Sequence, residues 1–525
     1  MKNVMKYAAV LLTCGCILAS CTDGFEEMNT NPFGVSDREL TQDNNLIGMH
    51  FPTIQQSIYY NRGGWDYQLF QNLNADIWSG YMATPTNFAG GINNQTYFLL
   101  NSWNDACWEY TYSSVMSNQI KVREKCAEQG GVYAHYDAIN TILRVLAMSR
   151  ICDQYGPVIY SKYGESLLGG EYDSAQDAYK LFFSELDQAV RTLSEYADKE
   201  APSFTNFDMA YGGDLVKWTK LGNTLRLRLA MRTVKYDAAW ARAEGEAAIR
   251  APRGLLEKGE SFIISGFGWK HPLYTCSIEY QDIFISANIQ SILTGYGDAR
   301  LDRFGLPNGD RQIAGVRTGL PDLADLADSY KAVISRINVT AEAPAVIVPA
   351  AEAYFLLAEA ALRGWDTNGG DAKTFYEEGI DASFAQWGVA VGDYAGRSNL
   401  PNDWDDPLRD DFDSPAVSKV SPKWEEAGSD EERLEKIITQ KWIAGFPEGM
   451  NAWAEWRRTG YPKLFPVLKN DSQGAISTEL GVRRLTYTLS EQRNNPEGYL
   501  KAVELLGGPD TGATRLFWDV DKPNF

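Results

Sequence analysis

Apolar residues recur at helical spacing along much of this chain. Ile139, Ile142, Leu143 and Leu146 follow one another at positions i, i+3, i+4 and i+7, which places them on one face of an amphipathic helix. The pattern predicts a helix over residues 132–155, ended by Gly156-Pro157 because proline cannot continue it. A second stripe begins after Asp173-Ser174 and predicts the next helix. Its members are Tyr179, Phe182, Phe183, Leu186, Val190 and Leu193.

Further helices are predicted from apolar spacing and from residues typical of helix ends. Pro349 stands where the first turn of a helix tolerates proline, and Ser429 opens a capping box with Glu432. These predicted helices cover residues 36–60, 102–129, 213–235, 237–250, 349–364, 371–387, 429–445 and 449–458. They form pairs of roughly 35–45 residues, which is typical of helical repeats. We therefore expect a mainly α fold with a tetratricopeptide-like helical-repeat scaffold; the alternative is an irregular all-α domain.

Three long segments break the helical pattern, near residues 61–101, 252–345 and 390–428. They combine Gly, Pro, Asn and Asp with many aromatic residues. Segments of this length without regular structure are usually functional or disordered, and their richness in Trp, Tyr and Phe argues against disorder. We expect them to form an irregular, loop-rich side that binds the ligand.

The N-terminus has the pattern of an export signal. Lys2 and Lys6 precede an apolar run from Tyr7 to Leu18, which is about half the length of a membrane-spanning helix. The tetrapeptide Leu18-Ala-Ser-Cys21 resembles a bacterial lipobox, in which the cysteine becomes the lipidated first residue of the mature chain. We expect a signal peptide over 1–20, a lipidated Cys21 with a flexible acidic linker over 21–34, and a single domain over 35–525. The alternative is an ordinary soluble secreted protein.

Composition excludes several classes of partner. The formal net charge of −20 disfavours phosphate backbones and anionic lipid surfaces, so we expect no nucleic acid partner. No later stretch is apolar for long enough to span a bilayer. Cys107 and Cys126 lie in one predicted helix, about 28 Å apart at 1.5 Å per residue, and cannot bond. Cys126 and Cys152 could bridge neighbouring helices, but we expect mostly free, buried thiols and no zinc site.

No catalytic constellation is evident. The three histidines, His50, His135 and His271, are dispersed, and no HExxH, GxSxG, GxxxxGK[ST] or GxGxxG motif in the required context is present. The aspartates between Asp403 and Asp413 lack the spacing of an EF-hand, so we interpret them as a solvated acidic loop. We expect no catalytic residues, no metal and no cofactor.

A binding site is better supported. A sugar ring needs an exposed aromatic plane beside Asn, Asp, Gln or Arg, whereas a peptide needs backbone partners and side-chain pockets. The irregular segments supply both kinds of group. The candidate ligand residues are Trp78, Tyr81, Asn87, Phe88 and Asn93 in the first segment, Trp269 and Tyr274 in the second, and Tyr394 and Trp404 in the third. Our hypothesis is that some of these aromatic residues converge on one face.

Several segments, in order along nearly the whole chain, resemble the SusD/RagB nutrient-binding outer-membrane lipoproteins of Bacteroidota. After the lipobox come acidic residues and Asn29-Thr-Asn-Pro. The other segments are Leu146-Ala-Met-Ser-Arg-Ile-Cys-Asp-Gln-Tyr-Gly-Pro-Val, Lys217-Trp-Thr-Lys-Leu-Gly-Asn-Thr-Leu-Arg-Leu-Arg-Leu-Ala-Met-Arg, Tyr296-Gly-Asp-Ala-Arg-Leu-Asp and Trp453-Ala-Glu-Trp-Arg-Arg-Thr-Gly-Tyr-Pro. We interpret these segments as structural: Trp453 and Trp456 as core residues one helical turn apart, and Asp298 with Arg300 as a fixed turn.

The resemblance implies a scaffold of about four tetratricopeptide-like helix pairs and a surface-exposed lipoprotein held in the outer membrane by acylated Cys21. It also implies a partner, a SusC-like TonB-dependent transporter barrel, which such a protein covers as a mobile lid. The implied cargo is an oligosaccharide or an oligopeptide. Two other functions remain open at this point: a surface glycanase or peptidase, and a structural helical-repeat adaptor without a small ligand.

Overall fold

The computed structural model describes residues 42–59, 62–166, 170–266, 268, 270–424 and 428–525. The chain divides into two units, Met1–Ile47 and Gly48–Phe525. The described part of the first unit holds η1 (Gln42–Asn44) and most of α4 (Asn45–Gly48). The predicted signal peptide, the lipidated Cys21, the linker and Trp269 lie outside the described residues.

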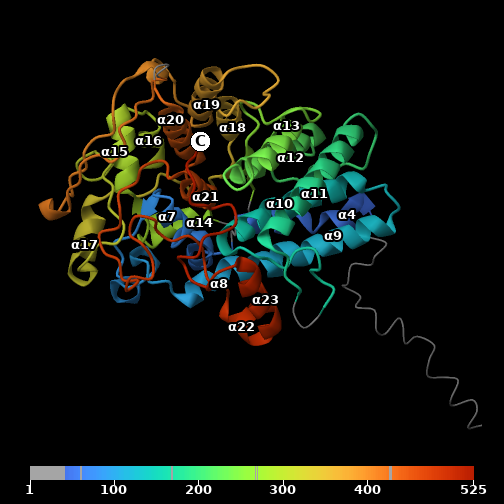
Figure 1. Ribbon diagram of the computed structural model, residues 1–525, viewed down its shortest axis with the longest axis horizontal. Coiled ribbons are helices and arrows are strands. Elements are labelled where there is room, and N and C mark those ends of the chain that lie inside the picture. Colours follow the sequence, from blue (N-terminus) through green and yellow to red (C-terminus); the bar gives the residue numbers. More distant parts are fainter. Residues whose placement is uncertain (1–41, 60–61, 167–169, 267, 269, 425–427) are drawn as a thin grey trace, which may run out of the picture. The chain divides into compact units, whose positions relative to one another are not determined.

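The second unit is built on paired helices, as the sequence predicts. In its first half α10 (Ala134–Tyr155), α11 (Ala175–Tyr196), α12 (Leu215–Arg232) and α13 (Ala238–Ile249) pack consecutively side by side (Figure 1). In its second half α18 (Ala351–Leu362) packs on α19 (Ala372–Gln386) and α20 (Asp430–Gly445), and α20 packs on α21 (Gly449–Thr459). The mainly α prediction is confirmed.

The predicted apolar stripes lie in the core. Ile139, Ile142, Leu143 and Leu146 of α10 are completely buried, and so are the stripe residues of α11. Several helices, though not α10, begin at a short polar cap whose oxygen accepts otherwise unpaired backbone N–H groups. Ser429 accepts a hydrogen bond from the Glu432 backbone N–H at 3.1 Å, so the predicted start of α20 is confirmed. The caps of α11, α12, α13 and α19 are Ser174, Asp214, Asp237 and Asp371.

Two predicted helices are divided in the structure. In place of one helix over 36–60, the described residues form η1, α4 and α5 (Phe51–Ile58), and Pro52 occupies the first turn of α5, where its missing N–H is not needed. In place of one regular helix over 102–129, α8 (Asn101–Tyr110) passes through a π-helical segment, η5 (Thr111–Met116), into α9 (Ser117–Glu128).

The segments predicted as loops contain more regular structure than the sequence indicates. Residues 252–345 hold the ten-residue α15 and the eleven-residue α17, which the flanking Gly, Pro and Asp residues obscure. The C-terminal α22 and α23 were also not predicted. The remaining helical elements are α6 (Gly64–Tyr67), η2 (Gln68–Asn72), α7 (Ala75–Trp78), η3 (Phe88–Gly91), η4 (Asn94–Thr96), η6 (Thr205–Phe207), α14 (Pro272–Tyr274), η7 (Thr275–Glu279), α15 (Ala287–Tyr296), α16 (Leu301–Phe304), α17 (Leu323–Val333), η8 (Tyr394–Gly396), η9 (Asp410–Phe412), α22 (Leu489–Asn494) and α23 (Pro496–Leu506).

Two small antiparallel sheets connect parts of the chain that are far apart in sequence. β1 (Met82–Ala83) pairs with β3 (Phe284–Ile285). β2 (Phe262–Ile264) pairs with β4 (Ala345–Val348), with an irregularity between Phe262 and Ile263. The cysteines are not part of these connections, because Cys107, Cys126, Cys152 and Cys276 are free and buried, as predicted.

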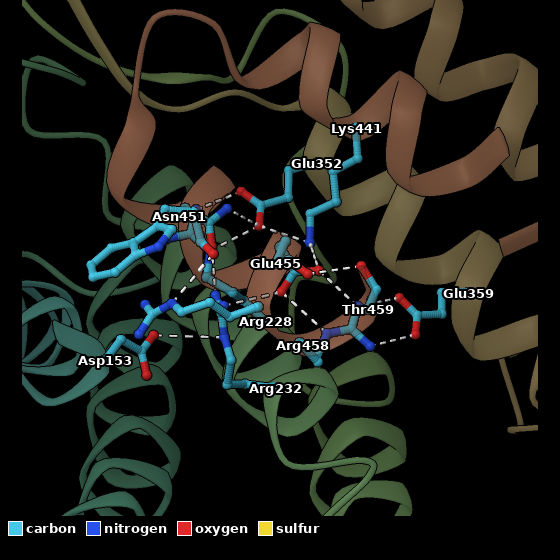
Figure 2. A network of polar contacts seen from close by, with 12 residues as sticks. Asp153, Arg228, Arg232, Glu352, Glu359, Lys441, Asn451, Glu455, Arg458 and Thr459 are labelled. Atoms are coloured by element: carbon cyan, nitrogen blue, oxygen red, sulfur yellow. Dashed lines mark hydrogen bonds and ion pairs between the residues drawn. The ribbon is translucent and has the colours of Figure 1, made fainter. Parts of the chain in front are cut away.

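A buried network of opposite charges joins the two halves of the helical scaffold (Figure 2). Glu455 of α21 lies within 2.7 Å of Arg458, 3.2 Å of Lys441 and 3.3 Å of Arg232. Arg458 also donates to both oxygens of Glu359 on α18. These cations hold the pKa of Glu455 well below its usual value although burial opposes ionisation. The charges therefore remain ionised inside the core only as a set.

The same network reaches α10 and α12. Arg228 donates to Glu352 at 2.9 Å, and Arg232 lies 3.6 Å from Asp153 of α10. Glu352 also lies 3.4 Å from Lys441. A buried ion pair stabilises little in total because desolvation offsets the attraction, but an unpaired buried charge is very costly. The network thus fixes the relative positions of α10, α12, α18, α20 and α21.

Replacing Glu455 by Gln should destabilise the protein strongly. The neutral amide leaves Arg232, Lys441 and Arg458 with fewer buried counter-charges, and loss of one partner in such a site costs about 3–5 kcal/mol. The change is measured as the urea midpoint of unfolding. The matched control is Glu504→Gln on α23, whose exposed pair with Lys501 should contribute no more than about 1 kcal/mol. Equal effects of the two substitutions would contradict the role given to the network.

Candidate functional site

Strand pairing brings two of the irregular segments together. Met82 of β1 faces Ile285 of β3, and Ala83 faces Phe284. In addition, α14 and η7 of the second segment pack against α6 of the first. The segments predicted near 61–101 and 252–345 therefore adjoin in space, although they are far apart in sequence.

Three aromatic side chains meet where these segments adjoin, and we call them the surface aromatic cluster: Trp65, Phe88 and Trp103. The Trp65 ring centroid lies 6.3 Å from that of Phe88 and 6.4 Å from that of Trp103, and Phe88 and Trp103 are 5.8 Å apart and nearly perpendicular. Trp65 is 45% exposed, whereas Trp103 is buried beneath it. The cluster therefore presents an indole surface to solvent on a fixed aromatic base.

A further exposed aromatic ring lies close by. A Cβ atom built on Gly64 would lie 2.9 Å from the Tyr280 ring, so this ring packs against the residue before Trp65. Tyr280 is itself largely exposed. The absence of a side chain at Gly64 is what permits this close approach, and it keeps Tyr280 beside the cluster.

The turn after Phe88 fixes how this ring is displayed. Ala89, Gly90 and Gly91 all have positive φ, at 49°, 68° and 79°, a conformation in which glycine is unstrained. Asn93 stabilises this turn, because its amide Nδ2 donates to the Phe88 carbonyl at 2.8 Å. Its Oδ1 accepts the Gln95 backbone N–H at 3.0 Å.

A carboxylate ties this loop to the second segment. Asp282 accepts hydrogen bonds from the Thr86 hydroxyl at 2.8 Å and from the Gln68 amide at 3.4 Å. Lys331 of α17 lies 3.8 Å from the same carboxylate. Beside Trp65, Asp66 accepts a hydrogen bond from the Tyr110 hydroxyl at 3.0 Å. Aromatic and polar groups thus occur together, as recognition of a polar ring requires.

The predicted ligand residues divide by exposure. Asn87 is exposed, and Phe88 and Tyr274 are half-buried. Five are buried: Trp78, Tyr81, Asn93, Tyr394 and Trp404. The structure brings Asn87, Phe88 and Asn93 together at the cluster, and α14, which ends at Tyr274, packs against α6. Ligand contact by any of these residues stays a prediction.

Tyr394, Trp404 and Tyr81 are buried and have polar partners in the core. Tyr394 is 1% exposed. The Arg300 guanidinium lies over its ring, and Arg300 and the Gln440 amide donate hydrogen bonds to its hydroxyl. Trp404 donates its indole N–H to Gln290 at 3.0 Å. Tyr81 donates to the Trp442 carbonyl.

Trp78 lies at a different place, in the wall of a separate recess of about 290 Å³ that also includes Tyr97, Trp456 and Phe465. The prediction that Trp453 is a core residue is confirmed, since it is completely buried. Trp456, predicted as core, is only half-buried and lines this recess. The predicted turn at Asp298 and Arg300 is confirmed as a buried ion pair at 2.6 Å.

Sequence reasoning missed Trp65, Trp103 and Tyr280. Trp65 follows Gly63-Gly64 within a segment already marked as functional, so the signal was available. Trp103 was assigned to a predicted helix, and nothing in its sequence context separates a core tryptophan from one that supports a surface ring.

The three histidines bond to three different parts of the described chain. His50 bonds Asn118 at 3.0 Å, His135 bonds the Pro202 carbonyl at 2.8 Å, and His271 accepts the Leu273 backbone N–H at 3.2 Å. Burial lowers the pKa of His271 to about 4, so it is neutral at physiological pH. Within the described residues, no group of three or more His, Cys, Asp or Glu side chains could hold a metal ion.

The family model described as SusD-like, "Susd and RagB outer membrane lipoprotein", matches residues 27–519. The chain belongs to the SusD-like family. Members of this family are outer membrane lipoproteins. Among the helices in the described ranges, none combines the length and apolar character needed to cross a membrane.

Solved structures of SusD homologs are similar to this SusD-like chain over nearly its whole length. A chitin-binding SusD homolog from Flavobacterium johnsoniae is 44% identical with a TM-score of 0.88, covering 91% of this chain and 100% of that one. A homolog from Bacteroides vulgatus is 36% identical with a TM-score of 0.86, covering 93% and 100%. A third, from Bacteroides uniformis, is 31% identical with a TM-score of 0.84, covering 91% and 99%. No curated protein matches the chain. Together the similarities support a nutrient-binding surface protein.

Replacing Asn93 by Ala should loosen the turn that displays Phe88. The substitution leaves the Phe88 carbonyl and the Gln95 N–H without their buried partner, at a cost of about 1–3 kcal/mol. We expect faster backbone hydrogen exchange over residues 86–97 and a lower melting temperature. The control is Asn87→Ala, an exposed position expected to change stability by no more than about 0.5 kcal/mol. Unchanged exchange in the Asn93 variant would contradict this role.

Proposed function

We propose that this SusD-like protein captures oligosaccharides at the outer surface of the cell and delivers them to a SusC-like TonB-dependent transporter barrel. The observation that carries the proposal is the surface aromatic cluster with its neighbouring polar groups. Sugar rings present an apolar face that stacks on an indole and a rim of hydroxyls that bonds to polar groups. The similar homolog from Flavobacterium johnsoniae is described as chitin-binding, which also favours glycan cargo.

An oligopeptide is the second candidate cargo, and the structure favours it less. Extended peptides commonly bind by adding a strand to an exposed sheet edge. The strands of the described residues are two to four residues long, which offers few backbone partners. Because the cluster is built of ring faces rather than an open strand edge, a glycan makes better use of it.

The protein acts as a binding protein rather than an enzyme in this proposal. Within the described residues, the three histidines bond to three different parts of the chain. We also propose a signal peptide over 1–20 and a lipid on Cys21, followed by a flexible linker over 21–34. Such a tether holds the body near the transporter while allowing it to move as a lid. A lipid of this kind anchors a protein to the membrane without a spanning helix.

Replacing Trp65 or Phe88 by Ala should weaken glycan binding about tenfold or more, because stacking residues at the centre of a site dominate affinity. Isothermal titration calorimetry of the full chain with hexamers of N-acetylglucosamine, β-linked glucose and α-linked glucose measures the effect. A mixed hexapeptide pool tests the second candidate cargo.

The control for this experiment is Leu500→Ala, a change at an exposed apolar residue on α23 outside the cluster. The glycan affinity of the Leu500→Ala variant should equal that of the wild type. Correctly folded Trp65 and Phe88 variants that bind every hexamer as tightly as the wild type would remove the cluster from the site. Binding of the peptide pool alone would replace glycan by peptide as the cargo.

Replacing Cys21 by Ala should separate anchoring from binding. Without the acceptor for the lipid, the protein should leave the membrane fraction and glycan uptake by the cell should stop, while the affinity for glycan stays unchanged. Cell fractionation, an uptake assay and calorimetry measure the three quantities. Retention of the variant in the outer membrane would contradict the proposed anchor, and loss of affinity would contradict the separation of tether from binding.

A further inference from the structure

We propose that the recess beside Trp78 is a second ligand site, separate from the surface aromatic cluster, and that it binds a single neutral sugar ring. The recess has a volume of about 290 Å³, near the lower end of small-molecule pockets at about 300 Å³. It therefore has room for one ring, or for the terminal residue of a chain, but not for an extended oligomer. The inference depends on the proposed function only for the class of ligand.

The recess has different walls from the cluster. They come from the end of α7, from α15 and α21, and from the loops over 464–467 and 478–482. Pro466, Thr478 and Glu479 are exposed lining residues, so the recess opens to solvent on their side. None of the three cluster residues lines it.

Its aromatic walls are held in place before any ligand arrives. Trp78 donates its indole N–H to the Asn94 carbonyl at 3.1 Å, and its ring packs on Trp453 at 4.8 Å between centroids. Phe465 packs against Trp404 at 6.3 Å. A wall fixed in this way loses little side-chain freedom on binding, which favours affinity.

The Tyr97 hydroxyl is an unused polar group in this wall. Tyr97 is only 8% exposed, and its hydroxyl has no hydrogen-bond partner among the described residues. It lies 3.3 Å from the position that a Cβ atom would take on Gly481, another lining residue. The hydroxyl can therefore bond to a ligand oxygen that enters the recess. Burial raises the pKa of Tyr97 to about 12, so the group is a donor at physiological pH.

Two further lining residues carry donors without a partner among the described residues. Asn288 uses its Oδ1 to accept the Phe465 backbone N–H at 2.8 Å, while its Nδ2 has no hydrogen bond within the described residues. The half-buried Trp456 likewise has no partner there for its indole N–H. The donors of Tyr97, Asn288 and Trp456, together with the aromatic walls, suit a ligand with several acceptor oxygens and an apolar face. A neutral pyranose ring has this combination, and the exposed Glu479 carboxylate at the mouth disfavours anionic rings.

Gly481 keeps the recess open. A Cβ atom at this position would lie 3.0 Å from the Trp456 ring and 3.3 Å from the Tyr97 hydroxyl, so any side chain would close the gap between these two walls. Its φ of 62° also favours glycine. The backbone thus leaves free the space in which a ring can contact both Trp456 and Tyr97.

Ligand-detected NMR titration of the full chain with monomeric N-acetylglucosamine and glucose tests the proposal. At least one monomer should bind. Tyr97→Phe should weaken its binding about fivefold, through loss of one hydrogen bond. The melting temperature should stay at the wild-type value, because the hydroxyl has no partner to lose. Trp456→Leu should weaken binding about tenfold or more, since it removes a stacking wall. Leu500→Ala, outside the cluster and the recess, should leave monomer binding unchanged.

The outcomes separate this proposal from the proposed function. If neither monomer binds while the hexamers bind the cluster normally, the recess is not a sugar site and the proposed function stands. Wild-type monomer affinity in the folded Tyr97 variant or in the folded Trp456 variant also overturns the proposal. If neither monomers nor hexamers bind, both proposals fail.

Discussion

The buried charge network between the helical repeats is the constraint on which the rest of the structure depends. Glu455 has three cationic neighbours, and each of these has another acidic partner or neighbour in the core. Such charges tolerate burial only when all are paired. The requirement therefore sets the positions of α10, α12, α18, α20 and α21 together, more strictly than apolar contacts, which adapt to small shifts.

The position of α21 in turn sets the position of the irregular segments. Arg150 of α10 pairs with Glu448 just before α21, and the Gly449 backbone N–H donates to Asp76 of α7 at 3.0 Å. A Cβ atom on Gly449 would lie 2.4 Å from the Asp76 carboxylate, so only glycine permits this close approach. α7 then leads into β1, whose pairing with β3 joins the two irregular segments. The geometry at the surface thus follows from the charges in the core.

One short segment serves both proposed sites. Phe88 at its start belongs to the surface aromatic cluster, and Tyr97 at its end lines the recess. Between them, Asn93 bonds the Phe88 carbonyl and caps η4, while the Asn94 carbonyl accepts the Trp78 indole N–H. A change in the shape of this segment therefore moves both sites, even though their walls are otherwise independent.

The sequence predicts the scaffold well because its apolar stripes are long and its caps are local. The stripe of α10 and the cap at Ser429 are examples. It predicts α15 and α17 poorly because short helices between glycines and aspartates leave little periodicity to detect. The exposure of individual aromatic residues is harder still to predict from the sequence. Trp65 and Trp404 are both followed by Asp within irregular segments, yet one is exposed and the other buried, because only tertiary contacts such as the Gln290 amide decide the difference.

The charge distribution bears on the cargo as well. The network in the core balances its own charges, so the net charge of −20 is carried mainly by exposed side chains. A surface of this kind repels anions and attracts cations over about a Debye length, which is roughly 8 Å at physiological ionic strength. Neutral glycans approach such a surface without electrostatic help or hindrance, and stacking on aromatic rings does not depend on charge. The affinity for a neutral glycan should therefore be nearly independent of salt, whereas attraction of a basic peptide would fall as salt is added.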